Sequence, residues 1–600
     1  APHGTQRRID MTQVEPKGLD IWQAHVRMAT EGDWTFRIEG WSDPWGTWRH
    51  NTLAKLPLGM DVELLCLEGR ELFHEAAETA EQSRVLAASH LLRAAAEALN
   101  PNTPVSEIED LVNSRPIERA MARFGPREAI SATQEYPIRV ERRRALYSSW
   151  YEFFPRSQGA MRDEEGHWIS GGFDSSHSRL EAIAAMGFHV AYLPPIHPIG
   201  SAFRKGKNNS LDPAPDDPGS PWAIGSIEGG HDAIHPALGD LESFERFVAK
   251  AKSLGLELAL DLALQASPDH PWVQEHPEWF TTRLDGTIAY AENPPKKYQD
   301  IYPLNFDNDP EGIYQEVLRV VQLWIDRGVT IFRVDNPHTK PVEFWDWLLE
   351  RVHETNPEVI FLAEAFTKPQ MMAALGKVGF QQSYTYFTWR VAKWELTEYL
   401  TELSRDMAPY YRPNFFVNTP DILPFHLQSG NPAIFAIRAI LAATLSPSWG
   451  VYSGFELFEH TPLAQGREEY LNSEKYEYRP RDFTEEPNLN LLLGTLNGIR
   501  EKHQALQQLR DIHFHHAPHD SVMAYSKHDG DDVMLMVCSL DPDNTVESEV
   551  YLDLPALGLP PGAAVEVHDE LSGDTYIWGE KNWVRLYPGK PAHIFHVTPH

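Results

Sequence analysis

The sequence predicts an α/β protein built on a (β/α)8 TIM barrel with loop insertions. An N-terminal β segment plus a helical insertion precede the barrel, and a C-terminal antiparallel β-sandwich domain follows it. Three observations support this prediction: eight short apolar segments alternate with helical periodicity, acidic residues follow four of them, and evenly spaced strands replace helices near the C-terminus. The 600 residues also exceed what one hydrophobic core normally supports.

The N-terminal segment, residues 1–58, is predicted to be a β domain whose shortness leaves its completeness open. Apolar residues alternate in "IWQAHVRM" and again in "WTFRIEGW", and the turn-forming "TEGD" between them indicates a hairpin. Residues 59–135 change to helical spacing, with Val85, Leu92 and Leu99 on one face. This pattern predicts a helical insertion.

Residues 136–512 form the predicted catalytic barrel. Its eight strands are expected in the segments "LYSSWYEFF", "FHVAYLPPI", "LELALDLAL", "VTIFRVDN", "VIFLAEAF", "FQQSYTYF", "NFFVNTPDI" and "SWGVYSGFEL". A doubly wound open sheet is the alternative, but no glycine-rich phosphate-binding turn follows any of these strands. The alternation of strands and helices therefore favours a closed barrel.

The segments between the strands predict helices, two long insertions and the final domain. "IYQEVLRVVQLWIDRG" places apolar residues on one face and ends at Gly328, which is typical of a helix. Insertions are expected at about 197–235 and 266–308, where loops of this length are usually functional or disordered. Residues 513–600 carry seven short strands at regular spacing and predict the β-sandwich.

Four predicted strands lead into acidic residues. Because side chains alternate along a strand, Ile331, Arg333 and Asp335 of "IFRVD" share the face toward the barrel interior, with Asp335 at the C-terminal rim. The acids after strands 3, 4, 5 and 7 are Asp261, Asp335, Glu364 and Asp421. A single acid at this place often caps the following helix, but four together, one of them inside an apolar strand, favour a catalytic site.

The acids on neighbouring strands fit retaining glycoside chemistry, which needs two carboxyl groups about 5 Å apart. Asp335 would attack the anomeric carbon, and Glu364 would act as acid and then base. Asp421 would stabilise the transition state. Arg333 would keep the Asp335 carboxylate ionised and oriented, unless the two form only a structural ion pair.

Four segments resemble the ordered signature regions of the alpha-amylase superfamily: "ALDLALQAS", "IFRVDN", "FLAEA" and "VNTPD". Two departures are informative. Common amylases carry Asn-His where this chain has Gln265 and Ala266, and a histidine where it has Pro420. These departures weaken the interpretation as a calcium-binding, starch-degrading enzyme.

Longer strings resemble one subgroup, the bacterial alpha-1,4-glucan:maltose-1-phosphate maltosyltransferases. They are "FRKGKNNS", "DPGSPWAIG", "NPPKKYQDIYP", "VDNPHTKP", "NTPDIL" and "NSEKYEYRPRD". The resemblance implies a retaining glycosyltransferase that moves a maltosyl unit from alpha-maltose 1-phosphate to the non-reducing end of an alpha-1,4-glucan. A β-maltosyl enzyme on Asp335 would form with release of phosphate, without a cofactor, and the resemblance also implies a homodimer.

The resemblance also implies substrate-binding residues. The positions that match the phosphate site are Asn293, Lys296, Tyr298 and Asn336. Those that match the sugar site are Lys205, Gln265 and Lys475, and Asp261 is also expected to bind substrate. Other interpretations stay open: Lys205 and Lys296 could be exposed loop charges, Asn293 could be a turn residue, and His338 is as compatible with a structural role as with ligand binding.

Two other functions are compatible with this framework. An amylase-like hydrolase or trehalose-forming enzyme would use the same three acids without needing Lys296, and a non-catalytic glucan-binding protein would not need the acids at all. The net charge of −33 argues against nucleic acid, and the absence of a run of about 18 apolar residues argues against a membrane span. The widely separated Cys66 and Cys538 form no metal motif and favour a reducing, cytoplasmic location.

Overall fold

The computed structural model describes residue 4 and residues 6–14, 16–293 and 296–600, without the side chains of residues 17, 293 and 296. The chain divides into two compact units, Ala1–Val140 and Glu141–His600. Each unit has its own buried apolar residues, so each is considered by itself.

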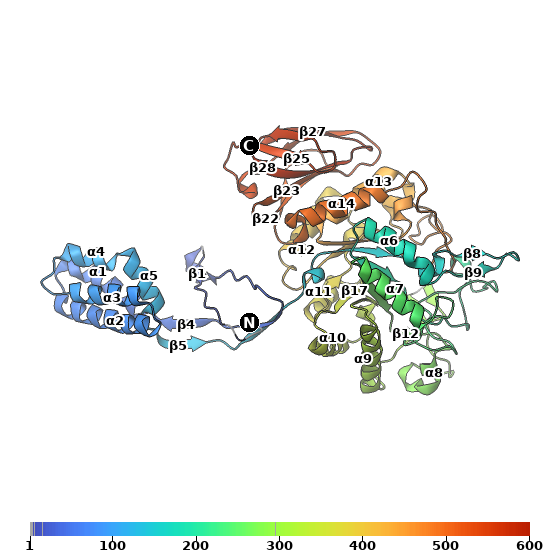
Figure 1. Ribbon diagram of the computed structural model, residues 1–600, viewed down its shortest axis with the longest axis horizontal. Coiled ribbons are helices and arrows are strands. Elements are labelled where there is room, and N and C mark those ends of the chain that lie inside the picture. The colour runs from blue at the N-terminus through green and yellow to red at the C-terminus, as the bar shows by residue number, and fades with distance from the viewer. Residues whose placement is uncertain (1–3, 5, 15, 294–295) are drawn as a thin grey trace. The chain divides into compact units, whose positions relative to one another are not determined.

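Five α-helices lie together in the first unit (Figure 1) and contain all of its buried cluster except Leu56 and Leu99, each at a helix end. They are α1 (Pro44–Lys55), α2 (Val62–Gln82), α3 (Leu86–Ala98), α4 (Val105–Val112) and α5 (Arg115–Phe124). Trp45 and Trp48 of α1 pack against Phe73 of α2, with ring centroids 5.4 and 5.9 Å apart. The helical part thus starts at Pro44, within the range 1–58 that the sequence pattern assigned to a β domain.

The strands of the first unit pair differently from the predicted hairpin. β3 (Gly32–Phe36) pairs with β6 (Tyr136–Val140), and β4 (Glu39–Ser42) pairs with β5 (Glu128–Ala132), on the far side of the helices in the sequence. β2 (Trp22–Gln23) pairs instead with β1 (Thr12–Gln13). The hairpin prediction was wrong because alternation of apolar and polar residues identifies a strand but not its partner.

Eight parallel strands of the second unit form the predicted barrel. They are β7 (Ser148–Glu152), β10 (Val190–Leu193), β11 (Glu257–Leu262), β16 (Ile331–Asp335), β17 (Ile360–Glu364), β18 (Gln382–Ser383), β19 (Asn414–Phe416) and β20 (Ser448–Tyr452). Their order is β18-β17-β16-β11-β10-β7-β20-β19, and a parallel bridge between Ser383 and Pro413 joins the two ends. All eight lie in the expected segments, and the (β/α)8 prediction is confirmed.

Helices follow the strands and cover the outside of the barrel (Figure 1). They are α6 (His177–Ala185), α7 (Leu241–Ser253), α9 (Pro310–Asp326), α10 (Val342–Thr355), α11 (Pro369–Lys377), α12 (Lys393–Ser404), α13 (Pro432–Leu445) and α14 (Asn490–Lys502). In α9, the Asp309 side chain accepts a hydrogen bond from the Gly312 N–H at the start, and Gly328 takes a positive φ of 94° just beyond the end. Both termini therefore match the signals in the sequence.

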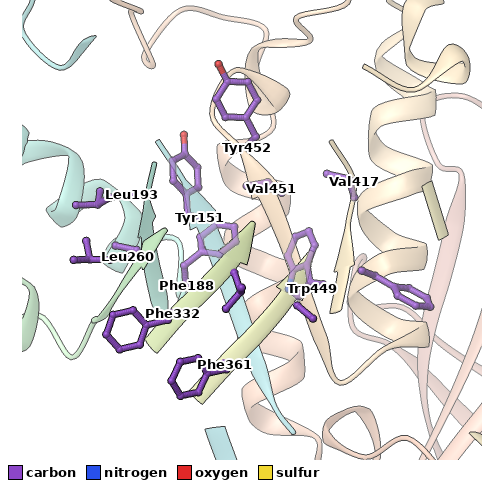
Figure 2. Packing of buried hydrophobic residues seen from close by; sticks show 14 of the residues in the cluster. Tyr151, Phe188, Leu193, Leu260, Phe332, Phe361, Val417, Trp449, Val451 and Tyr452 are labelled. Atoms are coloured by element: carbon purple, nitrogen blue, oxygen red, sulfur yellow. The ribbon is translucent and has the colours of Figure 1, made fainter. Parts of the chain in front are cut away.

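Alternation along the strands separates the barrel interior from the layer under the helices. Phe332 and Phe361 point outward from neighbouring strands with ring centroids 5.5 Å apart, and Figure 2 shows them within the large cluster that the helices cover. Ile331 belongs instead to the interior cluster. Arg333, two residues further along β16, therefore points into the barrel as predicted.

The two insertions contain short paired strands or bridges, and residues 294–295 lie outside the described residues. β12 (Gln265–Ala266) pairs with β15 (Tyr302–Pro303). The segment between these two strands contains the short α8 (Pro271–Glu275) and a second pair, β13 (Ala291–Asn293) with β14 (Lys296–Tyr298). In the earlier insertion, a bridge joins Ile199 to Ile224, and β8 (Met161–Arg162) and β9 (Trp168–Ile169) form a hairpin that precedes it.

The C-terminal residues form two antiparallel sheets. The larger sheet contains β21 (Ile512–His515), β22 (Val522–Asp529), β23 (Asp532–Ser539), β28 (Ala592–Pro599), β25 (Val565–Asp569) and β26 (Thr575–Trp578), while β24 (Val546–Tyr551) pairs with β27 (Lys581–Leu586). One buried cluster contains residues of both sheets, such as Val537 and Val550. This agrees with the predicted sandwich, to which the structure adds β21.

Among the described residues, no helix combines the length and apolar character that crossing a bilayer would require. The division into the ranges 1–58, 59–135, 136–512 and 513–600 stays a prediction.

Candidate active site

Asp335 and Glu364 lie side by side at the C-terminal rim of the barrel. They are the last residues of β16 and β17 and are register partners in the parallel pair. Neighbouring strands lie about 4.8 Å apart, which is compatible with the carboxyl separation of about 5 Å that retaining chemistry needs. The side chains of both are almost wholly buried, with 10% and 12% exposed.

Arg333 connects the acids of three strands. Its Nη1 donates to Asp335 Oδ1 at 2.9 Å and to Asp261 Oδ2 at 2.8 Å, and its Nη2 lies 3.2 Å from Glu364 Oε1. The guanidinium also lies 5.8 Å from the ring centroid of Tyr384 and 6.0 Å from that of Tyr192. Its five N–H donors in a fixed plane fix the directions of the surrounding carboxylates.

The same surroundings drive the pKa values of the two rim acids apart. Burial would raise the pKa of Asp335, but Arg333, Lys340 and Lys475 outweigh burial and hold that pKa below its usual range. Burial raises the pKa of Glu364 to about 8, and the charges of Asp335, Asp421 and Asp261 add to the increase against Arg333. At neutral pH the site therefore holds one carboxylate and one carboxylic acid, as acid–base chemistry requires.

Asp421 follows β19 and is paired with a lysine. Lys475 Nζ donates to Asp421 Oδ1 at 2.7 Å and lies 4.7 Å from the ring centroid of Trp222. The Asp421 side chain is 46% exposed, the most open of the three rim acids. One of its oxygens is thus held by a cation while the group faces the open side of the rim.

Asn336 directly follows Asp335 and adopts a left-handed conformation, with φ 43° and ψ 54°. This conformation aims its backbone N–H at Glu364 Oε2, 3.3 Å away, and leaves its side chain exposed. Asparagine tolerates the left-handed region better than most residues. The strand end therefore links the two rim acids through both a guanidinium and a backbone amide.

Several of the expected substrate-binding residues lie on the loops that follow the barrel strands. Lys205 is buried and donates to Gln299 Oε1 at 2.7 Å, so it is not an exposed loop charge. Gln265 Nε2 donates to the Trp222 carbonyl at 3.4 Å, and half-buried Tyr298 lies near Lys475. The side chains of Asn293 and Lys296 lie outside the described residues.

Asp261 differs from the other strand-end acids because it is embedded in protein. Its Oδ2 accepts from Arg333, from Tyr192 at 2.6 Å and from Trp222 at 3.2 Å. Its Oδ1 has no hydrogen-bond partner among the described residues. Half-buried His338 likewise has an Nδ1 without such a partner, and burial lowers its pKa.

Several residues of the site were not identified from the sequence. Tyr192 and Glu152 occupy inward positions two residues after Val190 and Trp150, so strand alternation could have found them. Trp222 lies in a loop, and it reaches Asp261 and Lys475, which are distant in sequence, only in the folded structure. Its signal was limited to its place in "DPGSPWAIG".

A cluster of three side chains of the types that can bind a metal ion was also not predicted from the sequence. Ligand atoms of His503, Asp532 and His596 come within 4.8 Å of one another, at the end of α14 and on β23 and β28 rather than at the barrel rim. Hydrogen bonds account for the arrangement, because the two ring nitrogens of His503 contact Asp532 at 2.9 Å and Glu570 at 3.2 Å.

Solved structures with the same architecture are alpha-amylases and related enzymes. A maltogenic alpha-amylase from Thermotoga neapolitana matches with a TM-score of 0.60 and 18% identity, covering 76% of this chain and 99% of that one. An alpha-amylase from Geobacillus thermoleovorans matches with a TM-score of 0.59 and 15% identity, covering 75% and 98%. These likenesses show that the chain shares the fold of these barrel enzymes.

Sequence relatives are more specific. The family model "Alpha-1,4-glucan:maltose-1-phosphate maltosyltransferase, domain N/S" matches residues 1–142, and "GLGE, C-terminal" matches residues 514–597. The maltosyltransferase 2 of Streptomyces coelicolor is 54% identical over 98% of this chain and 87% of its own length. The Mycobacterium tuberculosis enzyme is 51% identical over 94% and 81%. The chain belongs to the alpha-1,4-glucan:maltose-1-phosphate maltosyltransferase family.

Proposed function

We propose that the protein transfers a maltosyl unit from alpha-maltose 1-phosphate to the non-reducing end of an alpha-1,4-glucan, with retention of configuration. The observation that carries the proposal is the register pair Asp335 and Glu364, whose pKa values are displaced in opposite directions. The named activity of relatives more than 50% identical supplies the donor and the acceptor.

In the first step, the Asp335 carboxylate attacks C1 of the donor, and the bond between C1 and the phosphate oxygen breaks. Glu364, protonated at neutral pH because its pKa is about 8, gives its proton to the departing phosphate. A β-maltosyl ester on Asp335 results. Arg333 holds the attacking carboxylate through Oδ1, and Asp421 would stabilise the oxocarbenium-like transition state.

In the second step, the 4-hydroxyl of the glucan attacks C1, the ester bond breaks and Asp335 is regenerated. Glu364 now takes the hydroxyl proton. Because the negative charge of Asp335 is one cause of the raised Glu364 pKa, forming the neutral ester removes that charge and lowers the pKa. Glu364 would therefore change from acid to base when the intermediate forms.

Incubation with alpha-maltose 1-phosphate and maltohexaose tests the function. We expect phosphate release matched by products longer by two glucose units. Asp335→Ala should abolish both, with a fall of at least about 10⁴-fold that is typical of losing a nucleophile. Release of phosphate without chain extension would favour the hydrolase alternative. The absence of both release and extension would refute the proposed donor.

We also propose that the enzyme acts in the cytoplasm as a homodimer. Two buried cysteines without a disulfide, Cys66 and Cys538, suit a reducing compartment. The dimer rests on the family resemblance alone. Sedimentation of the intact protein measures it directly.

A further inference from the structure

Lys340 is a cation beside the reacting acids with unused hydrogen-bonding capacity. It follows the short 3-10 helix Pro337–Thr339 that starts directly after Asn336. Its Nζ donates to Thr339 Oγ1 at 2.8 Å, and no carboxylate oxygen of the described residues lies within 4.0 Å of it. An ammonium has three donors, so two of them lack a strong protein acceptor in the part of the chain described.

The ammonium nevertheless interacts electrostatically with Asp335 and Glu364. Burial lowers the pKa of Lys340, while Asp335 and Glu364 act in the opposite direction. In return, Lys340 is one of the cations that lower the pKa of Asp335. The side chain is half-buried, which makes an unsatisfied ammonium costly unless an acceptor arrives from outside the protein.

Two other cations at the rim, Arg333 and Lys475, already pair with carboxylates. Arg333 pairs with Asp261, Asp335 and Glu364, and Lys475 pairs with Asp421. Neither can turn to a further anion without losing a carboxylate partner. Of Arg333, Lys475 and Lys340, the three cations that act on the pKa of Asp335, only Lys340 has no acid within ion-pair distance among the described residues.

We propose that Lys340 binds the departing phosphate of the donor, with its two free N–H groups directed at phosphate oxygens. The inference rests on the proposed function and adds a contact that the sequence did not suggest. In the donor complex, before the ester forms, the phosphate would lie beside Glu364 and meet the negative charge of Asp335. A positive group at that place offsets the repulsion, and charge-assisted hydrogen bonds to phosphate are about twice as strong as neutral ones.

The test compares two donors that differ only in the leaving group, alpha-maltose 1-phosphate and alpha-maltosyl fluoride. For Lys340→Gln we expect kcat/KM with the phosphate donor to fall about 10- to 100-fold, and with the fluoride donor to change less than about threefold. Lys340→Arg, which keeps the charge, should lose less. Inhibition of the fluoride reaction by inorganic phosphate should weaken in parallel in Lys340→Gln.

Lys377→Gln, at the exposed end of α11, is the matched control and should leave both donors unaffected. Equal losses with the two donors would overturn the proposal, since Lys340 would then act only on Asp335. Unchanged phosphate inhibition in Lys340→Gln would overturn it too. Failure of the wild type to use maltose 1-phosphate while using the fluoride would refute the proposed function separately.

Discussion

The protonation of the rim acids depends on single side chains, and pH therefore tests the site. The proposed mechanism requires ionised Asp335 and protonated Glu364, so kcat/KM should fall as pH rises through about 8, the pKa of Glu364 in the free enzyme. The donor phosphate titrates near pH 6, well below this limb. Rates measured from about pH 7 to 10 in wild type and Glu364→Gln check it. A limb near pH 8 that survives in the variant would contradict the assignment.

Glu152 is a buried acid that the proposed chemistry does not use. It ends β7, and its Oε2 has no hydrogen-bond partner among the described residues. Burial, with the charges of Asp261, Asp421 and Glu364, raises its pKa far above the usual value against the effect of Arg333. The folded protein thus holds a neutral carboxylic acid here, which a neutral amide of the same shape can replace.

Stability measured against pH tests this charge state. A raised folded-state pKa contributes stability that is complete below the unfolded value of about 4.3 and is lost as pH rises. Glu152→Gln should therefore melt above wild type at about pH 8, and the difference should shrink toward pH 5. Scanning calorimetry across this range decides the matter. A difference between the two melting temperatures that stays constant from about pH 5 to 8 would mean that Glu152 is ionised in the folded protein.

The individual acids were predictable because a strand has a period of two and barrel enzymes place their chemistry where strands end. That logic located Asp335, Glu364 and the inward Arg333 without any structure. It could not find Lys340 or Trp222, because loops have no fixed period and contacts such as Lys475 over Trp222 join segments far apart in sequence. Such contacts exist only once the barrel has closed.

At the scale of elements, β19 and β20 fit together through a glycine. A Cβ on Gly450 would lie 2.6 Å from the Phe416 ring, which stacks on Tyr384 with centroids 4.6 Å apart. Gly450→Ala must displace that ring, which we expect to cost about 1–3 kcal/mol and to lower activity through Tyr384, whose ring lies near Arg333. Denaturant unfolding and phosphate release measure the two effects.

Gly498→Ala is the matched control, because nothing lies within 4 Å of its added Cβ in α14. It should be neutral or stabilising, since alanine favours helix by about 1 kcal/mol over glycine. If Gly450→Ala were equally harmless, β19 and β20 would be less tightly packed than the structure indicates.

Elements with a strong local period were predictable, and their partners were not. The eight barrel strands and α9 carry their own signals of alternation, capping and length. The predicted pairing of the N-terminal strands was wrong because β3 pairs with β6, which follows α1 to α5 in the sequence. Short alternating segments do not encode such a long-range pairing.

For the whole molecule, the buried clusters indicate two folding units. One cluster contains only residues from 45 to 124, and the largest contains only residues from 151 to 594. Phe73 and Phe435 are fully buried in the first and second of these. Each Phe→Ala change should cost its own unit about 3–5 kcal/mol, because it removes the ring and leaves a cavity.

Calorimetry of the intact protein should therefore resolve two transitions. Phe73→Ala should lower one of them, and Phe435→Ala should lower the other, while each leaves the second transition within about 1 °C. Phosphate release measured during heating should disappear with the transition that Phe435→Ala moves, since every acid of the site belongs to residues 141–600. A single transition that both variants shift equally would mean that the chain unfolds as one cooperative body, and the two clusters would then not define separate units.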